Sequence, residues 1–230
     1  MIIEVIATSL YDAVAIEKYG ADRIELIENL SIGGITPDLR LSEEICNCVN
    51  IPVNIMVRPH AESFIYDNHD MRQIEGDIDH IASKVRANAI VFGSLDESGN
   101  INFVQLERVL KILERTRMSL TFHRAIDACN NPLQAFKELQ QYKGTALERV
   151  LSSGGMKTAI EGQSIIQQMN EVSKSKNGVK VLAGSGLSSL NVKDFLNCTG
   201  VDEVHFGTGL RGDNLQLQKN LFEQLHLNLS

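Results

Sequence analysis

Positive charge is scarce in this sequence and is nowhere concentrated. Its 230 residues contain 22 Lys and Arg against 29 Asp and Glu, which gives a formal net charge of −7. There is no basic run, and no basic patch is interleaved with aromatic residues as in proteins that bind nucleic acids. We therefore expect no nucleic-acid partner.

Long apolar stretches are missing as well. No run approaches the roughly 20 residues that a membrane span requires. The chain reaches Glu4 after only three residues, unlike a signal peptide. We expect no membrane partner and a cytoplasmic location, where the four cysteines are reduced thiols. They are Cys46, Cys48, Cys129 and Cys198.

One common binding motif is absent, and another does not occur in the first turns of the predicted units. There is no C-x-x-C pair, and Cys46 and Cys48 fall in a helical stretch where residues two apart point to nearly opposite sides. That spacing is poor for a closed metal site. No first turn carries G-x-G-x-x-G, so nothing implies a dinucleotide or another organic cofactor. On the strand faces expected to point inward, Met56, His123 and His205 could help to hold a soft metal, but an isolated Met is usually core filler.

What the sequence does contain is a regular alternation of short β-branched runs with longer stretches of helical periodicity. This alternation is typical of βα units around a parallel sheet. The predicted strands are Ile2–Ala7, Arg23–Glu28, Val53–Arg58, Ala89–Leu95, Leu120–Arg124, Arg149–Ser153, Val179–Ala183 and Glu203–Gly207. The predicted helices are Leu10–Tyr19, Leu39–Val49, His69–Arg86, Asn102–Arg115, Pro132–Gln141, Thr158–Ser173, Asn191–Leu196 and Asn214–Leu225.

Eight such units in 230 residues fit a single α/β domain over residues 1–230, a (β/α)8 barrel of the TIM type. A doubly wound open sheet is the alternative, but that fold normally uses fewer strands. No linker, low-complexity tract or charge block marks a second domain.

The polar residues of five predicted strands share one parity. Side chains alternate between the two faces of a strand, and the outer face of a parallel barrel is apolar because helices cover it. The polar side chains of these strands are therefore expected to point inward and to converge inside the barrel. They are Glu4, Glu25, Arg58, His123 and His205. These residues form either a structural ion-pair plug or a functional site. Five together favour a site, because buried ionic clusters are weak stabilisers.

The segment SLTFHRAID, residues 119–127, ends one of these strands with an imidazole, a guanidinium and a carboxylate: His123, Arg124 and Asp127. In an enzyme, Glu4 or Glu25 would act as general acid or base. His123 would then shuttle a proton with Asp127 tuning it, and Arg58 with Arg124 would hold an anionic group.

Two late loops are rich in small residues, and such loops let backbone N–H groups approach an anion. We expect an anion-binding role for them, although glycines also simply make tight turns. The residues are Ser152, Ser153, Gly154 and Gly155 after the sixth strand, and Gly184, Ser185 and Gly186 after the seventh.

Several segments resemble the CutC family, which is named for copper homeostasis. They are EVIATSLYDAVAIEKYGADRIELIENLSIGGITPD, PVNIMVRPHAESFIYDNHD, TFHRAID, RVLSSGG and VHFGTG, in order and at matching separations. The resemblance implies a cytosolic (β/α)8 barrel, often oligomeric, that binds or buffers Cu(I). It places Glu4, Glu25, Arg58, His123, Arg124, Asp127 and the Ser152–Gly155 loop at characteristic positions.

The chain departs from that pattern at Ile6 and Ile27, where many relatives carry cysteine, the natural soft ligand of Cu(I). Two hypotheses follow: a copper homeostasis protein that binds Cu(I), or an enzyme acting on a small anionic metabolite at the barrel mouth. A third is a scaffold whose outer helices serve oligomerisation, with Tyr11, Tyr19 and Cys46–Val49 as contact surface. A homo-oligomer, first of all a dimer, is the expected assembly.

Overall fold

The computed structural model describes residues 1–229, and within them eight parallel strands close into one barrel. Each strand pairs with its neighbours in chain order, and β8 closes the ring by pairing with β1. The predicted (β/α)8 fold is therefore confirmed. The strands are β1 (Ile2–Ala7), β2 (Arg23–Leu26), β3 (Val53–Met56), β4 (Ala89–Phe92), β5 (Ser119–Phe122), β6 (Leu147–Ser152), β7 (Lys180–Gly184) and β8 (Glu203–Phe206).

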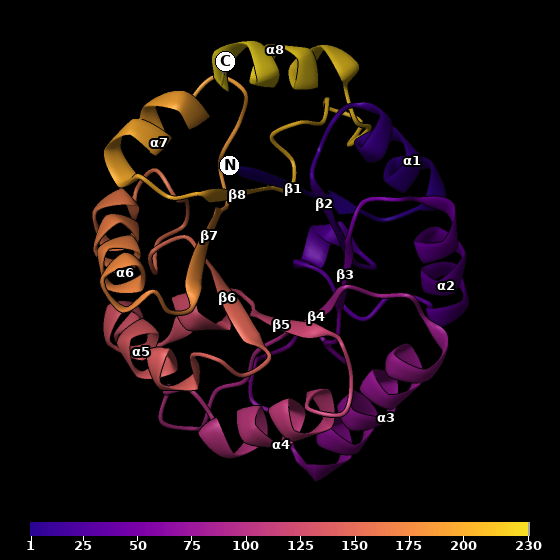
Figure 1. Cartoon of the computed structure of the whole chain (residues 1–230), viewed down its shortest axis with the longest axis vertical. Helices are drawn as coiled ribbons and strands as arrows, with labels where there is room; N and C mark the ends of the chain where they lie inside the picture. The colour runs from indigo at the N-terminus through magenta and orange to yellow at the C-terminus, as the bar shows by residue number, and fades with distance from the viewer. Residues whose placement is uncertain (230) are drawn as a thin grey trace.

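The helices form an outer ring around the strands (Figure 1). They are α1 (Leu10–Lys18), α2 (Leu39–Cys48), α3 (Asn68–Lys84), α4 (Phe103–Leu113), α5 (Pro132–Leu139), α6 (Gln163–Lys176), α7 (Val192–Thr199) and α8 (Lys219–Leu229). Short 3-10 helices add η1 (Leu30–Ile32), η2 (Arg124–Ala128) and η3 (Gln140–Tyr142). Side-chain caps fix several starts; Asp67, for example, accepts from the N–H groups of His69 and Asp70 at the start of α3.

Two helices begin later than the periodicity predicts. The sixth begins at Gln163 rather than Thr158, because the Ala159 N–H donates to the Ser185 carbonyl and ties this stretch to the end of β7. The eighth begins at Lys219 rather than Asn214. Before it, Arg211 pairs with Leu217 in an antiparallel bridge that is incompatible with a helix.

The main apolar core lies between the barrel and its helices, and a second, smaller cluster lies inside the barrel. That inner cluster consists of Ile6, Ile27, Met56 and Val91. Ile6 and Ile27 follow Glu4 and Glu25 at the spacing of two that keeps side chains on one face of a strand. The barrel interior therefore carries a polar layer and, toward the carboxyl ends of the strands, an apolar one.

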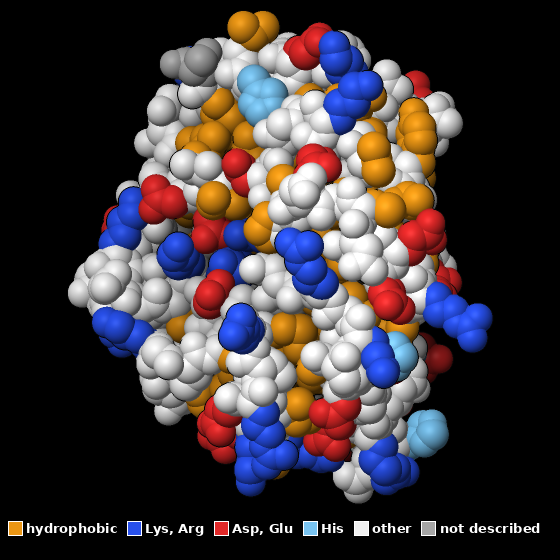
Figure 2. All heavy atoms as spheres, turned by 45° about the vertical axis from the view of Figure 1, so that its right-hand side comes forward, with side chains coloured by type: hydrophobic (Ala, Val, Ile, Leu, Met, Phe, Trp, Pro, Cys, Tyr) orange, Lys and Arg blue, Asp and Glu red, His pale blue; other side chains and the backbone are white. Residues whose placement is uncertain are grey.

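The outer surface mixes charges of both signs. Figure 2 shows acidic and basic side chains interspersed over one face, with apolar side chains between them. Among residues 1–229, no helix is both long enough and apolar enough to cross a membrane.

Candidate active site at the barrel mouth

A lattice of ion pairs fills the amino-terminal half of the barrel. Arg23 of β2 donates from Nε to Glu4 of β1, and from Nη2 to Glu203 of β8 at 2.6 Å. Arg149 of β6 donates from Nε to the same Glu203 carboxylate at 3.0 Å. All four side chains are buried, so each charge needs the others to compensate for lost hydration. Of the five residues predicted to form either a plug or a site, Glu4 is the member of this lattice.

The Glu4 carboxylate has hydrogen-bond donors from three side chains. It accepts hydrogen bonds from Arg23, from the Asn54 amide at 3.1 Å, and from His205 Nδ1 at 2.8 Å. Burial alone raises the pKa of Glu4, but the charge of Arg23 and the hydrogen bond from His205 outweigh it and lower the pKa to about 2. Glu4 is therefore a permanent anion at any physiological pH.

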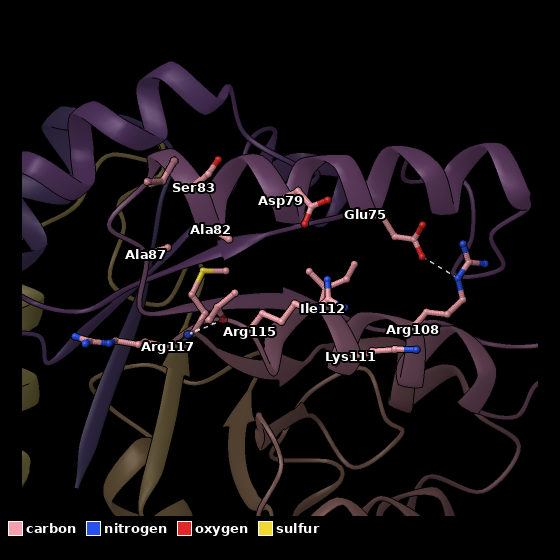
Figure 3. A pocket seen from close by; sticks show the side chains of 13 residues that line it. Glu75, Asp79, Ala82, Ser83, Ala87, Arg108, Lys111, Ile112, Arg115 and Arg117 are labelled. Carbon is pink, nitrogen blue, oxygen red and sulfur yellow. Dashed lines mark hydrogen bonds and ion pairs between the residues drawn. The ribbon is translucent and has the colours of Figure 1, made fainter.

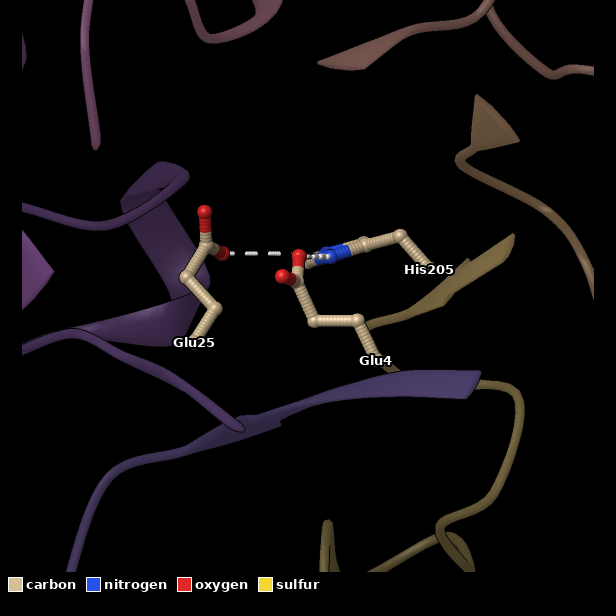
Figure 4. Close-up of side chains that lie close together, drawn as sticks. All are labelled: Glu4, Glu25 and His205. Atoms are coloured by element: carbon tan, nitrogen blue, oxygen red, sulfur yellow. Dashed lines mark hydrogen bonds and ion pairs between the residues drawn. The ribbon is translucent and has the colours of Figure 1, made fainter. Parts of the chain in front are cut away.

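His205 links Glu4 to Glu25, as Figure 4 shows. Its Nδ1 lies 2.8 Å from Glu4 Oε1, and its Nε2 lies 3.7 Å from Glu25 Oε2. Burial opposes a charge on this ring, yet the two carboxylates raise the pKa of His205 above its ordinary value. The structure thus places the His205 ring between two carboxyl groups, which favour its protonated form.

The same three residues are the metal-ligand cluster that the described residues offer. Their donor atoms all lie within 4.8 Å of one another. Oxygen and imidazole donors suit hard or intermediate cations rather than Cu(I), which prefers sulfur. Within this cluster His205 is the ion-pairing partner of both carboxyl groups.

Glu25 differs from Glu4 because one of its carboxylate oxygens lacks a hydrogen-bond partner. Its Oε1 is buried and has no hydrogen-bond partner. Burial raises the pKa of Glu25 to about 7, with the Glu4 charge adding to the rise and His205 and Arg23 opposing it. Near neutral pH this carboxyl group can therefore give or take a proton, which is the property of an effective general acid or base.

Arg58 and His123 stand just beyond the carboxyl ends of β3 and β5. Arg58 donates to the carbonyls of Gly34 and Ala61 and lies over the Phe64 ring, 4.6 Å from its centroid, yet its Nε has no partner. His123 Nδ1 accepts from the Ala125 N–H at 3.1 Å. Burial and the Arg58 charge lower the pKa of His123 to about 3. The ring is therefore neutral with its proton on Nε2, another buried atom without a partner.

One cavity of about 310 Å³ collects these side chains. Its polar lining includes Glu25, Arg58, His123, Arg124 and His205, which the sequence predicts, together with Ser185 and Gly186 of the predicted anion loop. Glu4 lies next to the cavity through its contact with His205 but does not line it. Gly184, Asp127 and the Ser152–Gly155 loop do not line it either.

The Ser152–Gly155 loop binds an internal anion instead, the Asp127 carboxylate. Asp127 accepts from the N–H groups of Ser153 and Gly155 at 3.0 Å and from the Ser152 hydroxyl at 2.6 Å. Arg124 completes the arrangement by donating to Asp127 at 2.8 Å. These donors already have acceptors, and Asp127 does not contact His123, so the predicted tuning of that imidazole is not part of this geometry.

Some lining residues escaped the sequence analysis. Phe64, Leu187 and the segment Gly207–Gly209 line the cavity. Arg23, Arg149 and Glu203 complete the ion lattice below it. Arg23 and Glu203 share the parity of Glu25 and His205, which was the available signal for their inward direction.

Sulfur ligands are sparse around the cavity. Ile6 lines it, Ile27 lies in the apolar layer with Ile6, and Met56 is the sulfur-bearing residue in its lining. Cys46 and Cys129 are buried elsewhere, and Cys48 and Cys198 are exposed.

A larger hollow of about 810 Å³ lies on the outside of the barrel, between α3 and α4. Figure 3 shows Glu75 and Arg108 paired at one end of it, with Asp79, Lys111 and Arg115 along its walls. The Arg108–Glu75 pair is 2.8 Å long, and both side chains are partly exposed. No buried unpartnered polar atom of residues 1–229 belongs to its lining, so its chemistry is that of a solvated surface.

The chain is similar throughout to known proteins. A model of the CutC family matches residues 1–210. The chain is 36% identical over 218 residues to a CutC family protein of Treponema denticola, covering 95% of this chain and 85% of that protein. It is 34% identical over 205 residues to the human protein named copper homeostasis protein cutC homolog, covering 89% and 72%.

Solved structures agree with the fold. CutC from Streptococcus agalactiae superposes with a TM-score of 0.80 at 26% identity, covering 90% of this chain and 98% of that one. Phosphoribosyl anthranilate isomerase from Thermococcus kodakaraensis superposes with a TM-score of 0.66 at 13% identity, covering 99% and 98%. A likeness this distant in sequence extends to the barrel fold alone.

Proposed function

The chain belongs to the CutC family, and from the geometry of its barrel mouth we propose that it is an enzyme that moves a proton on a small anionic metabolite. The observation that carries this proposal is the set of buried polar atoms without a protein partner. Three of them, Glu25 Oε1, Arg58 Nε and His123 Nε2, belong to side chains that line one cavity. A native structure rarely leaves buried polar groups unpaired without a functional reason.

The three atoms have complementary roles. Glu25, with a pKa of about 7, exists in both protonation states near neutral pH. Arg58 Nε and His123 Nε2 are hydrogen-bond donors. One group that exchanges protons and two that donate to oxygen are what proton transfer beside a carbonyl requires.

Glu25, Arg58 and His123 are sufficient for such a proton transfer. The Glu25 carboxylate takes a proton from the carbon next to a carbonyl, and the electron pair of that C–H bond forms a C=C bond. The carbonyl π electrons move to oxygen, and the resulting enolate oxygen accepts hydrogen bonds from Arg58 and His123. The protonated Glu25 then returns a proton to the same carbon, and the C=O bond re-forms as the C=C bond breaks. Removing one such oxyanion donor typically costs about 10²–10³ in rate.

Exchange of carbon-bound hydrogen with D2O tests this proposal without knowledge of the final product. We would incubate the protein with pools of 2-oxo acids and of phosphorylated aldoses and ketoses, and follow the C–H signals next to the carbonyl by proton NMR. We expect catalysed loss of such a signal by the wild type and none by Glu25→Gln. Glu28→Gln, on the exposed segment after β2, is the matched control and should exchange like the wild type. Exchange at an undiminished rate in Glu25→Gln, or no exchange of any pool, would contradict the proposal.

Copper binding is the second candidate, and the observation that favours it is Met56 in the same cavity as His123. A thioether and an imidazole are possible ligands of Cu(I). Ile6 and Ile27 weigh against it, because they provide no thiolate. Titration of the reduced protein with Cu(I) against a competing chelator decides the matter: binding weaker than that of the chelator would remove this candidate.

A further inference from the structure

The far wall of the cavity is made of backbone rather than of polar side chains. It consists of Ser185–Leu187, after β7, and Gly207–Gly209, after β8. The two segments touch: a Cβ atom at Gly209 would lie 1.8 Å from the Leu187 carbonyl oxygen, so only glycine fits there. Ser185 and Gly186 both have positive φ, of 78° and 71°. The contact holds two short loops side by side at the carboxyl end of the barrel.

The N–H groups of these loops have no acceptor. Within residues 1–229, no hydrogen bond is donated by the N–H groups of Gly186, Leu187, Thr208 or Gly209. Gly186 and Thr208 are exposed and Gly209 is half-buried, so a ligand can reach this wall. Unsatisfied backbone donors grouped in one place constitute an anion site when they converge.

The loop after β6 provides a comparison within the same molecule. Its N–H groups, at Ser153 and Gly155, converge on the Asp127 carboxylate. In the part of the chain that the structure describes, no carboxylate accepts from the N–H groups of Gly186, Leu187, Thr208 or Gly209 in the loops after β7 and β8. The same type of loop is therefore occupied by an acidic side chain at one strand and left open toward the cavity at the next two.

The charges around the cavity favour an anion. Arg58 and Arg124 are permanent cations in the lining, His123 is neutral, and Glu25 is the one carboxyl group. His205 lies below the cavity between Glu4 and Glu25. Arg124 is already paired with Asp127, so Arg58, which has no carboxylate partner among residues 1–229, is the cation available to an entering anion. The buried polar atoms of Arg58 and His123 supply donors beyond those of the backbone.

We propose that the substrate is a phosphate monoester of a small carbonyl compound, with its phosphate on the Ser185–Leu187 and Gly207–Gly209 wall and its carbonyl toward Arg58, His123 and Glu25. This inference rests on the proposed proton transfer for the position of the carbonyl. A phosphate has three acceptor oxygens and suits donors from two loops better than a planar carboxylate does. A cavity of about 310 Å³ holds a metabolite of only a few carbons beside the phosphate.

Phosphate binding is tested with inorganic phosphate and with glycerol 3-phosphate, using glycerol as the unphosphorylated comparison. Calorimetry at about pH 7.5, where a phosphate monoester is a dianion, should show wild-type binding of both phosphates and none of glycerol. Thr208→Glu places a carboxylate on this wall and should weaken binding about tenfold or more through like-charge repulsion. Thr208→Gln adds similar bulk without charge and keeps the backbone N–H, so it should bind phosphate nearly as the wild type does.

The outcomes separate this inference from the proposed function. No phosphate binding by the wild type, or equal binding by Thr208→Glu and the wild type, overturns the phosphate site. If unphosphorylated 2-oxo acids nonetheless exchange deuterium through Glu25, the proton transfer stands alone. If phosphate binds as expected and Glu25→Gln binds it equally, but no carbonyl pool exchanges, the site stands and the proposed reaction fails.

Discussion

Glu25 is the residue on which the proposed proton transfer depends, and replacing it by Gln gives a stability test that requires no substrate. Burial raises its pKa from the ordinary 4.5 to about 7. The folded state thus holds this proton more tightly than the unfolded state does. The resulting contribution to stability is complete below pH 4.5 and is lost as the pH rises through 7. This difference in pKa between the folded and the unfolded state corresponds to about 3 kcal/mol in the free energy of unfolding.

Gln has the shape of a protonated Glu and does not ionise, so the variant escapes this loss. The free energy of unfolding of Glu25→Gln, minus that of the wild type, should increase by about 3 kcal/mol between about pH 4.5 and about pH 8. Urea denaturation at the two pH values measures it, with Glu28→Gln as the exposed control that should show no such trend. A difference that does not change with pH would mean that the Glu25 carboxyl titrates near its ordinary value, and Glu25 could then not serve as the proton carrier at neutral pH.

Three further perturbations probe the interior. Glu4→Gln leaves Arg23 buried with one of its two carboxylates neutralised, and should lower the free energy of unfolding at pH 7 by about 3–5 kcal/mol in urea denaturation; an unchanged midpoint would contradict the lattice. Asp127→Asn weakens a carboxylate that accepts two N–H groups of the Ser152–Gly155 loop, and should cost about 1–3 kcal/mol by the same assay; an unchanged urea midpoint would contradict this role of the carboxylate. The double variant Ile6→Cys, Ile27→Cys places two thiols in the apolar layer and should bind Cu(I) more tightly than the wild type in chelator competition; equal affinities would show that this layer does not determine copper binding.

Local patterns were sufficient to predict the barrel and the inward direction of several side chains. Strand alternation is a property of consecutive residues, so the direction of Glu4, Glu25 and His205 could be derived from the sequence alone. Arg58 and His123 lie beyond the ends of β3 and β5, yet they still face the cavity because the chain continues extended for a residue or two past each strand.

Features that depend on register between strands were not predictable in this way. Glu4 pairs across the sheet with Arg23 on one side and with His205 on the other. Nothing in the short segments around these residues specifies that alignment, because it is determined by the closure of the whole barrel. The ion lattice with Glu203 and Arg149 follows from it, so parity could indicate the direction of each side chain but not its partner.

The glycine-rich loops show a second kind of limit. SSGG after β6 and AGSG after β7 look equivalent in the sequence, and both were predicted to bind an anion. Their difference comes from Asp127, which lies 26 residues before Ser153 and reaches only the first loop. Loop function therefore depended on a side chain from a different loop, and composition alone could not reveal it.

The hydrogen-bond partners of the individual polar atoms distinguish two layers inside the barrel. Arg23 and Glu4 have partners for their charges within the lattice, and this network fixes Glu4 as a permanent anion. A fixed anion on one side of His205 helps to keep that imidazole protonated, so Glu25 on the other side is the carboxyl group whose charge can change near neutral pH. The ion lattice and the cavity are successive layers of the barrel interior. The lower layer is stabilised by ion pairs among Arg23, Glu4, Glu203 and Arg149, and the upper layer presents unpartnered atoms of Glu25, Arg58 and His123.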